Sequence, residues 1–116
     1  MTSDPLTSRT AGIVLVGAHD DEYGRILRAN QRFADLLVRQ LDALVGTRIC
    51  EHVHPGSQGE ARDTFFRLMA DLETVYEGNG RLVTSHGSVV PVRAFASVIT
   101  LRGGAAIVLR VLALSE

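Results

Sequence analysis

The sequence of 116 residues contains no lysine, no tryptophan and only one cysteine. All twelve basic residues are therefore arginine, and against thirteen acidic residues they give a formal net charge of -1. A chain without excess positive charge does not attract nucleic-acid backbones or anionic membranes, so we expect neither as a partner. The single Cys50 cannot form an internal disulfide, which agrees with a reducing compartment. Basic residues drawn from arginine alone are typical of GC-rich genomes and suggest a bacterial origin.

Long apolar runs are also missing. The longest one, residues 103–114, is interrupted by Arg110 and falls short of the ~20 residues of a membrane span. Residues 1–11 are polar and lack the apolar core of a signal peptide. We therefore expect a cytoplasmic protein, with residues 1–10 as a flexible N-terminal segment and residues 11–116 as a single domain.

The composition, 46% hydrophobic and 22% charged, is that of a folded globular chain. Two short apolar runs, residues 13–16 and 25–28, flank a polar stretch that contains glycine, and they predict a hairpin. Asn30 precedes apolar residues at helical spacing and predicts a helix that the asparagine caps. Residues 41–53 have too many interruptions for a long helix, so we expect only short helical turns there.

The second half of the chain predicts one long helix followed by three strands. Apolar residues at helical spacing predict the helix over residues 58–72, with Ser57 and Glu60 spaced as a capping box. Strands are predicted over residues 89–101 and 105–114, with Gly103-Gly104 as the hairpin turn, and a third strand between 75 and 84 pairs through His86-Gly87. Strands and helices that are segregated in this way favour an α+β domain with helices on one face of an antiparallel sheet.

Several segments follow one another in a characteristic order and spacing: Gly12–Val16, Gly24–Asn30, Phe33, Leu37, Leu44–Gly46, His54–Pro55 and Gly87–Ser88. Together they resemble the PAS family, over residues 11–114. The resemblance implies a five-stranded antiparallel sheet in the order 2-1-5-4-3, a ligand pocket between the sheet and the helices, and a role in sensing and signal relay. Val38 stands where the family usually has glycine, which leaves the turn after the first helix open. Residues 111–114 lack the aspartate-centred motif that often links such domains to an effector, so no effector is identified.

Members of this family often carry haem or flavin, but the residues here argue against both. A flavin ring needs polar groups at its edge, and residues 81–116 contain no Asn or Gln. Cys50 lies in Arg48–His52, which does not match the Asn-Cys-Arg-Phe-Leu-Gln run of photoreactive relatives. The usual axial histidine of haem-binding relatives is missing from residues 55–72, where Met69 is the only candidate ligand. We expect no cofactor.

Metal binding and catalysis have little support in the sequence. Cys50, His52 and His54 would share one side of an extended backbone, as metal ligands do, but the helical turn implied by the resemblance would separate them. The acidic cluster at residues 19–22 is expected to be a solvated hairpin loop. No phosphate loop, nucleophile elbow or pair of catalytic carboxylates is recognisable, so we predict no catalytic residue, no metal site and no enzyme activity.

Pairing the last two strands through Gly103-Gly104 puts Arg102 opposite Ala105 and assigns a face to every residue. The uncharged face should form an inner wall against the helices, and Ala94 and Ala96 at its centre either permit close packing or leave a hollow. An empty hollow of ~100 Å³ would cost about 2.4 kcal/mol, which favours a small apolar ligand. The predicted ligand-binding residues are Phe33, Leu37, Phe65, Leu68, Val92, Ala94, Ala96, Val98, Ile107 and Leu109. Arg81 faces the pocket if the His86-Gly87 loop has two residues, and Leu82 does so if the strand contains a bulge.

The outer face of the sheet is more apolar than a solvated face needs to be. Its predicted interface residues are Phe95, Ile99, Val108, Leu112 and Leu114. A homodimer through the sheet would bury them, as would a covering N-terminal segment, and the family resemblance favours the homodimer. We therefore expect a sensor that binds a small apolar molecule and relays its presence through the sheet or a dimer interface. The rival hypothesis is a protein-protein interaction module without a ligand.

Overall fold

The computed structural model describes residues 11–18, 23–70, 75–102 and 104–114. The predicted flexible segment 1–10 and the acidic cluster 19–22 lie outside these ranges. The elements, in chain order, are β1 (Gly12–Gly17), β2 (Ile26–Ala29), α1 (Gln31–Leu37), α2 (Leu41–Leu44), the 3₁₀ turn η3 (Ile49–His52), α3 (Pro55–Met69), β3 (Val75–Val83), β4 (Val89–Leu101) and β5 (Gly104–Ala113). The short helical turns expected over residues 41–53 are therefore present, as α2 and η3.

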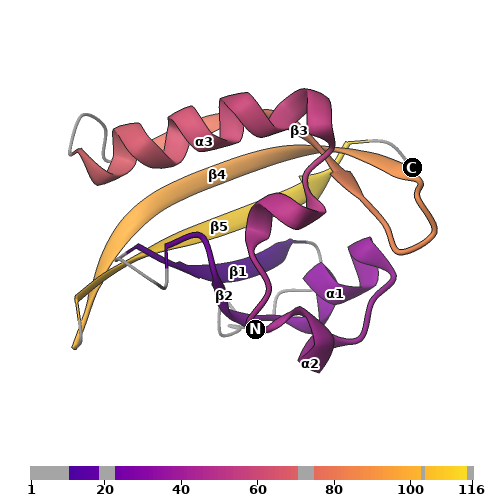
Figure 1. The fold of residues 1–116 in the computed structure, drawn as a ribbon, viewed down its shortest axis with the longest axis horizontal. Helices are drawn as coiled ribbons and strands as arrows, with labels where there is room; N and C mark the ends of the chain where they lie inside the picture. The colour runs from indigo at the N-terminus through magenta and orange to yellow at the C-terminus, as the bar shows by residue number, and fades with distance from the viewer. Residues whose placement is uncertain (1–10, 19–22, 71–74, 103, 115–116) are drawn as a thin grey trace, which may run out of the picture.

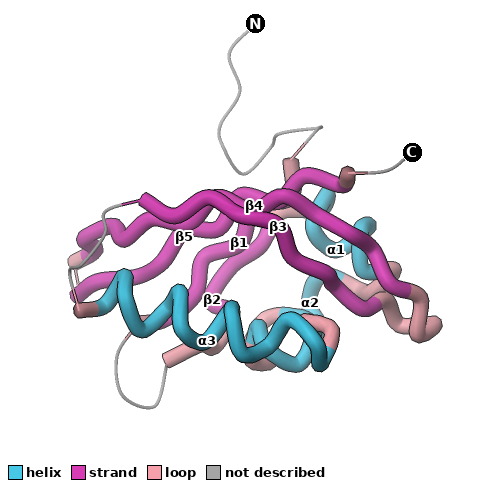
Figure 2. Tube along the Cα trace, turned by 90° about the horizontal axis from the view of Figure 1, so that it is seen from above, coloured by secondary structure: helices cyan, strands magenta, loops and turns pink. Residues whose placement is uncertain are grey.

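The five strands form one antiparallel sheet in the order β2-β1-β5-β4-β3. Helix α3 runs along β3 and β4, while α1 contacts β1 and α2 contacts β2 (Figure 1). Seen from above, α3 lies entirely on one side of the sheet (Figure 2). The fold class and strand order expected from the sequence are confirmed. Among the described helices, none is long and apolar enough to cross a membrane.

Asn30 joins the first helix to the first strand. Its Oδ1 accepts hydrogen bonds from the backbone N–H of Phe33 at 3.0 Å and of Ile13 at 2.9 Å, and its Nδ2 donates to the carbonyl of Ala11 at 3.1 Å. The side chain is 4% exposed, so these bonds replace water contacts that the buried amide has lost. The predicted helix cap is confirmed, and the same side chain also attaches α1 to β1.

Val38 ends α1 in the left-handed region, with φ 54° and ψ 50°. Its N–H donates to the carbonyl of Asp35 at 3.1 Å, and the next N–H, of Arg39, donates to Ala34 at 3.0 Å. The turn that usually contains glycine is therefore kept with a β-branched residue in it. Such a conformation costs an L-residue about 1–2 kcal/mol, so this turn is strained.

Helix α3 begins three residues earlier than predicted. His54 is its N-cap, accepting a hydrogen bond at Nδ1 from the N–H of Gly56 at 3.0 Å, and Pro55 takes the first helical position. Proline is well suited to this position because the N–H it lacks would have no helical partner. The predicted capping box is wrong, since Ser57 lies inside the first turn and its Oγ accepts from Arg81 Nε at 3.1 Å. The helix ends at Met69, and residues 71 and 72 of the predicted helix are not described.

The predicted pairing of β4 with β5 is wrong by two residues. Val98 pairs with Ile107, and Leu101 pairs with Gly104, so the turn lies at Arg102 and Gly103, of which Gly103 is not described. Gly104 begins β5 with φ 136°, a conformation that glycine adopts readily. Because side chains alternate with a period of two, a shift of two residues leaves every side chain on its assigned face. The face pattern of the sequence therefore could not distinguish the two registers.

The connection between β3 and β4 is also longer than predicted. Val83 pairs with Val89, so the loop spans residues 84–88, and Thr84 Oγ1 accepts hydrogen bonds from the N–H groups of His86 and Ser88. This register turns Leu82 inward, where it is 6% exposed, and leaves Arg81 exposed. The inner face of β3 thus consists of Tyr76, Gly78, Gly80 and Leu82.

Candidate functional site

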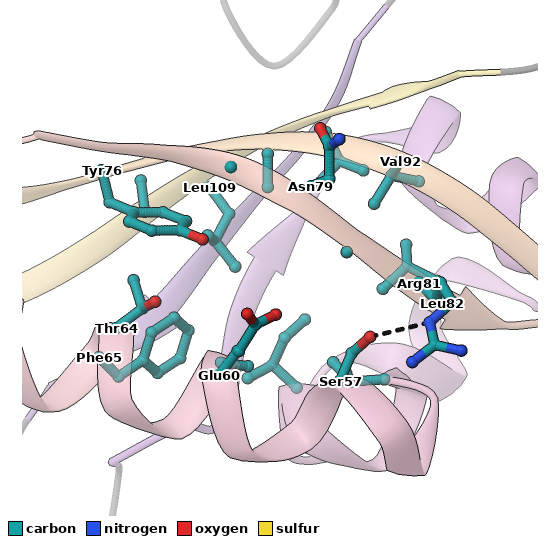
Figure 3. A pocket seen from close by; sticks show the side chains of 18 of the residues that line it. Ser57, Glu60, Thr64, Phe65, Tyr76, Asn79, Arg81, Leu82, Val92 and Leu109 are labelled. Atoms are coloured by element: carbon teal, nitrogen blue, oxygen red, sulfur yellow. Dashed lines mark hydrogen bonds between the residues drawn. The ribbon is translucent and has the colours of Figure 1, made fainter.

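A cavity of about 90 Å³ lies between α3 and the inner face of the sheet (Figure 3). Its lining is almost wholly apolar and is drawn from α1, η3, α3, β3, β4 and β5. Helix α3 contributes residues at positions 57, 60, 61, 64 and 65, a spacing that keeps them on one side of a helix. The helix is therefore the roof of the cavity, and the sheet is its floor.

The floor is hollow because its side chains are small. On β3 it consists of Gly78 and Gly80, which pair with Ala94 and Val92 of β4. A Cβ atom placed on Gly80 would meet nothing within 4 Å, so this position opens directly onto free space. A Cβ on Gly78 would instead overlap the hydroxyl of Tyr76, which lies back over its own strand. The floor is therefore open at the main chain of Gly80, whereas the Tyr76 side chain covers Gly78.

Three polar side chains line the cavity without a partner. Thr64 is only 9% exposed, and its hydroxyl forms no hydrogen bond with any described residue. The hydroxyl of Tyr76 and the carboxylate of Glu60 are likewise unpaired within the described part of the chain, although Glu60 is largely exposed. Figure 3 shows the Glu60 carboxylate turned from α3 toward the sheet. A bound molecule would find unpaired hydroxyl and carboxylate groups on this side of the cavity.

A second, more polar hollow of about 200 Å³ adjoins the cavity. Its lining residues are Glu60, Asp63, Thr64, Arg67 and Tyr76. Glu60, Thr64 and Tyr76 belong to both hollows, so they stand at the boundary between an apolar interior and a charged exit. On the opposite rim, Arg81 is held by its hydrogen bond to Ser57.

Six of the ten predicted ligand-binding residues line this cavity. They are Phe33, Phe65, Val92, Ala94, Ala96 and Leu109. Leu37, Leu68 and Ile107 are buried elsewhere in the core, and Val98 is half-buried against it. Arg81 and Leu82, between which the sequence left the choice open, both line the cavity. The apolar lining residues that the sequence did not predict include Ile49, Val53, Tyr76, Gly78, Gly80 and Val111. Gly78 and Gly80 are two residues apart, so they lie on the same face of β3. Which face that is depends on the register of the strand, which the sequence left open.

The outer face of the sheet is partly open. Phe95, Ile99, Val108 and Leu112 are half-buried, and Leu114 is 50% exposed. A shallow depression of about 160 Å³ lies among them, bordered by Val75, Phe95, Ser97, Val108 and Arg110. Beside it, Arg93 forms an ion pair with Glu77 and donates to Asn79 Oδ1 at 2.8 Å.

The segment considered for metal binding has separate roles. Cys50 is exposed on η3, and His54 caps α3, while His52 is 4% exposed. Among the described residues, no group of three or more His, Cys, Asp or Glu side chains could hold a metal ion.

His52 is held in one tautomer. Its Nε2 lies 2.9 Å from Thr47 Oγ1, whose own hydrogen is donated to the carbonyl of Leu44 at 2.6 Å, so Nε2 must carry the proton. Its Nδ1 is buried and has no hydrogen-bond partner among the described residues. Burial lowers the pKa of His52, Arg39 lowers it further, and Glu51 opposes both.

Comparison with known proteins gives a consistent result. The PAS fold family model matches residues 26–111. The PAS domain of an HTR-like protein from Haloarcula marismortui is similar with a TM-score of 0.76 and 16% identity, over 94% of this chain and 85% of that one. A PAS domain from Desulfitobacterium hafniense is similar with a TM-score of 0.75 and 17% identity, over 94% and 96%.

No protein with a curated description matches the sequence. The identities to the solved structures are low enough that those structures speak for the fold alone, whereas the family model matches the sequence itself over most of its length. The sheet order, the helical face and the matched residues agree, and the chain belongs to the PAS fold family.

Proposed function

We propose that this PAS domain is a sensor that binds a small, mainly apolar molecule in the cavity between α3 and the sheet. The observation that carries the proposal is the floor of Gly78, Gly80, Ala94 and Ala96, which keeps an apolar space open beneath the helix. Because the cavity is open to solvent on one side, an empty cavity leaves its apolar lining in contact with water, which costs about 25 cal/mol per Å² of apolar surface. An apolar occupant would recover much of that free energy.

The relay of ligand binding is proposed to run through β4 and β5. Successive residues on these strands face opposite sides, so Ala96 and Leu109 contact the cavity while their neighbours Phe95 and Arg110 reach the outer face. Filling the cavity would displace the strands that also carry the outer face. The sheet itself is thus the proposed connection between the ligand and a partner.

The partner proposed for the outer face is a second copy of this chain. A two-fold interface requires one patch to complement itself. This face combines half-buried apolar side chains with charges of both signs, Glu77 and Arg93 on one side and Arg110 within it. If the cavity remains empty, a homodimer of this kind would make the domain an interaction module without a ligand.

Neither haem nor flavin is proposed as the occupant, and no catalysis is proposed. A cavity of about 90 Å³ is far smaller than either ring system, and the part of α3 that forms the roof has no His, Cys or Tyr to ligate iron. Asn79, the one amide among the described residues that line the cavity, accepts a hydrogen bond from Arg93. A cytoplasmic location in a bacterium and an effector elsewhere in the signalling pathway complete the proposal.

Native mass spectrometry of the purified protein tests the sensor proposal directly. A co-purified adduct of small mass, released on denaturation, is the expected result. Thermal unfolding with added toluene provides a second measurement, because a ligand that binds only the folded state raises the midpoint in a concentration-dependent way. Absence of both an adduct and a shift would contradict the sensor and leave the interaction module.

A further inference from the structure

We propose that the ligand is a one-ring apolar molecule whose short side arm ends in a protonated amine directed at Glu60. The inference rests on the proposed function, which requires only an apolar occupant, and it adds the chemical class. It follows from the size of the cavity, from the unpaired Thr64 hydroxyl, and from the charges in the adjoining hollow.

Size limits the occupant first. A cavity of about 150 Å³ holds a benzene ring in a well-studied protein, whereas this one offers about 90 Å³. A ring therefore fills the apolar cavity completely and must project at its open side. The neighbouring hollow of about 200 Å³ receives whatever projects there, since the two share Glu60, Thr64 and Tyr76. The occupant is consequently apolar at one end and polar at the other.

The boundary between the two hollows favours a ligand with a hydrogen-bonding group. Thr64 is nine-tenths buried, and its hydroxyl has no partner among the residues that the structure describes. A purely apolar ligand would remove the remaining water from this hydroxyl and leave it unpaired, which is unfavourable. A ligand with a polar arm at this depth would pair with Thr64 and keep the ring against the glycine and alanine floor.

The charged residues that line the polar hollow determine which charge on the ligand's terminal group is favoured. The polar hollow is lined by two carboxylates, Glu60 and Asp63, and by one guanidinium, Arg67. Of these, Glu60 alone also lines the apolar cavity, and its carboxylate is turned toward it (Figure 3). Arg81, the cation on the opposite rim of the cavity, does not line this polar hollow. A cationic arm is therefore favoured over a neutral one, and a carboxylate arm is disfavoured.

Three probe molecules with the same ring and similar side arms test the expected order of affinities, in which a cationic arm binds most tightly and a carboxylate arm most weakly. 2-Phenylethylamine, 2-phenylethanol and 3-phenylpropionate differ chiefly in the charge of the terminal group, and NMR titration or calorimetry measures their Kd values. We expect the amine to bind tightest, the alcohol about fivefold more weakly, as for one solvent-accessible ion pair, and the carboxylate most weakly. Glu60→Gln should make the amine and the alcohol equal while leaving the Kd of the alcohol unchanged.

A matched control is available on the other side of the sheet. Glu77→Gln removes a carboxylate of the outer face and should leave all three Kd values unchanged. Thr64→Val should weaken the alcohol and the amine but not toluene, which has no polar group.

The outcomes separate the two proposals. Carboxylate binding as tight as amine binding, or an amine preference that survives Glu60→Gln, overturns the present inference while the sensor proposal stands. If toluene binds but none of the three probes with a polar arm does, the present inference is likewise overturned and the sensor proposal stands. If toluene and all three probes fail to bind and no adduct is found in the purified protein, both proposals are wrong.

Discussion

The guanidinium carbon of Arg110 lies 5.0 Å from the centroid of the Phe95 ring, and the two residues are cross-strand partners of β5 and β4 on the outer face. A cation placed over an aromatic face in this way is favourable by about 0.5–1 kcal/mol at an exposed site. The contact covers one face of an aromatic ring that would otherwise be in water. It also positions a positive charge within the apolar patch, next to the depression lined by Val75 and Val108.

Replacement of Phe95 by alanine should weaken self-association. If two copies pair through this face, the aromatic ring is a central contact, and its loss should raise the dimer Kd by about 30-fold or more, corresponding to 2 kcal/mol or above. Sedimentation equilibrium over a range of concentrations measures the change. Phe66→Ala is the matched control, because Phe66 is 71% exposed on the outer side of α3 and should not alter the Kd. A wild-type protein that remains monomeric at high concentration would contradict the dimer.

Val38→Gly should stabilise the protein. The substitution relieves the left-handed conformation of a β-branched residue, about 1–2 kcal/mol, and loses part of that through the greater freedom of glycine in the unfolded chain. Val38 is 49% exposed, and its carbonyl, which accepts from Ser85 Oγ at 2.6 Å, is retained. We expect the free energy of unfolding in urea to rise by about 0.5–1 kcal/mol.

Val45→Gly is the matched control for that substitution. Val45 is 45% exposed and also ends a helix, but its φ is -64°, an ordinary value for valine. Glycine at this position should lower the free energy of unfolding. If both substitutions destabilise to the same extent, the strain assigned to Val38 is absent.

The lowered pKa of His52 makes stability depend on pH in a defined direction. Above pH ~6.5 the imidazole is neutral in both the folded and the unfolded chain. As the pH falls below this value, the unfolded chain takes up the proton first, so the free energy of unfolding decreases until the lowered folded-state pKa is reached. The slope from this one group is at most about 1.4 kcal/mol per pH unit.

Urea unfolding at pH 7.5, 6.5 and 5.5 measures this contribution. His52→Gln should lose less stability than the wild type between pH 6.5 and 5.5, because the titrating group is gone. His86→Gln, in the exposed loop after β3, should retain the wild-type dependence. Identical pH profiles for the wild type and His52→Gln would contradict the assignment.

Gly80→Ala should raise the stability of the protein but weaken ligand binding. In the folded protein the added Cβ meets no atom within 4 Å, so it causes no clash. In the unfolded chain alanine has less conformational entropy than glycine, so the free energy of unfolding should rise by about 0.5–1 kcal/mol. The same methyl group takes volume from a small cavity and should weaken toluene binding by about fivefold.

Gly59→Ala serves as the control for Gly80→Ala. Gly59 lies in α3, and its added Cβ also meets nothing within 4 Å, but the residue does not line the cavity. It should stabilise the protein by a similar amount and leave toluene binding unchanged. Equal effects of both substitutions on binding would show that toluene does not occupy this cavity.

Much of the fold was predictable from local patterns. Asn30 identified the start of α1 because an asparagine cap is a local interaction, and the β-branched residues of 89–101 gave the bounds of β4. The strand order came from the resemblance to a family. The face of each residue on β4 and β5 survived a register error of two because side chains alternate with the same period.

The cavity was only half predictable for a related reason. Ala94 and Ala96 could be placed on the inner face, but Gly78 and Gly80 depend on the register of β3, which the loop at residues 84–88 determines. A one-residue change in that loop exchanges the two faces of β3, and the two-residue loop expected at His86-Gly87 would have turned Arg81 inward instead of Leu82. The polar group of Glu60, Thr64 and Tyr76 arises from the packing of α3 over β3, a long-range contact that no local spacing encodes.

The open position at Gly80 has one further consequence. Side chains in a cavity wall, such as Tyr76 over Gly78, can adapt to an occupant by changing rotamer, but the backbone at Gly80 has no rotamer to change. At this point the floor moves only when β3 bends. If the proposed ligand binds here, one that is slightly too thick would therefore bend this edge of the sheet.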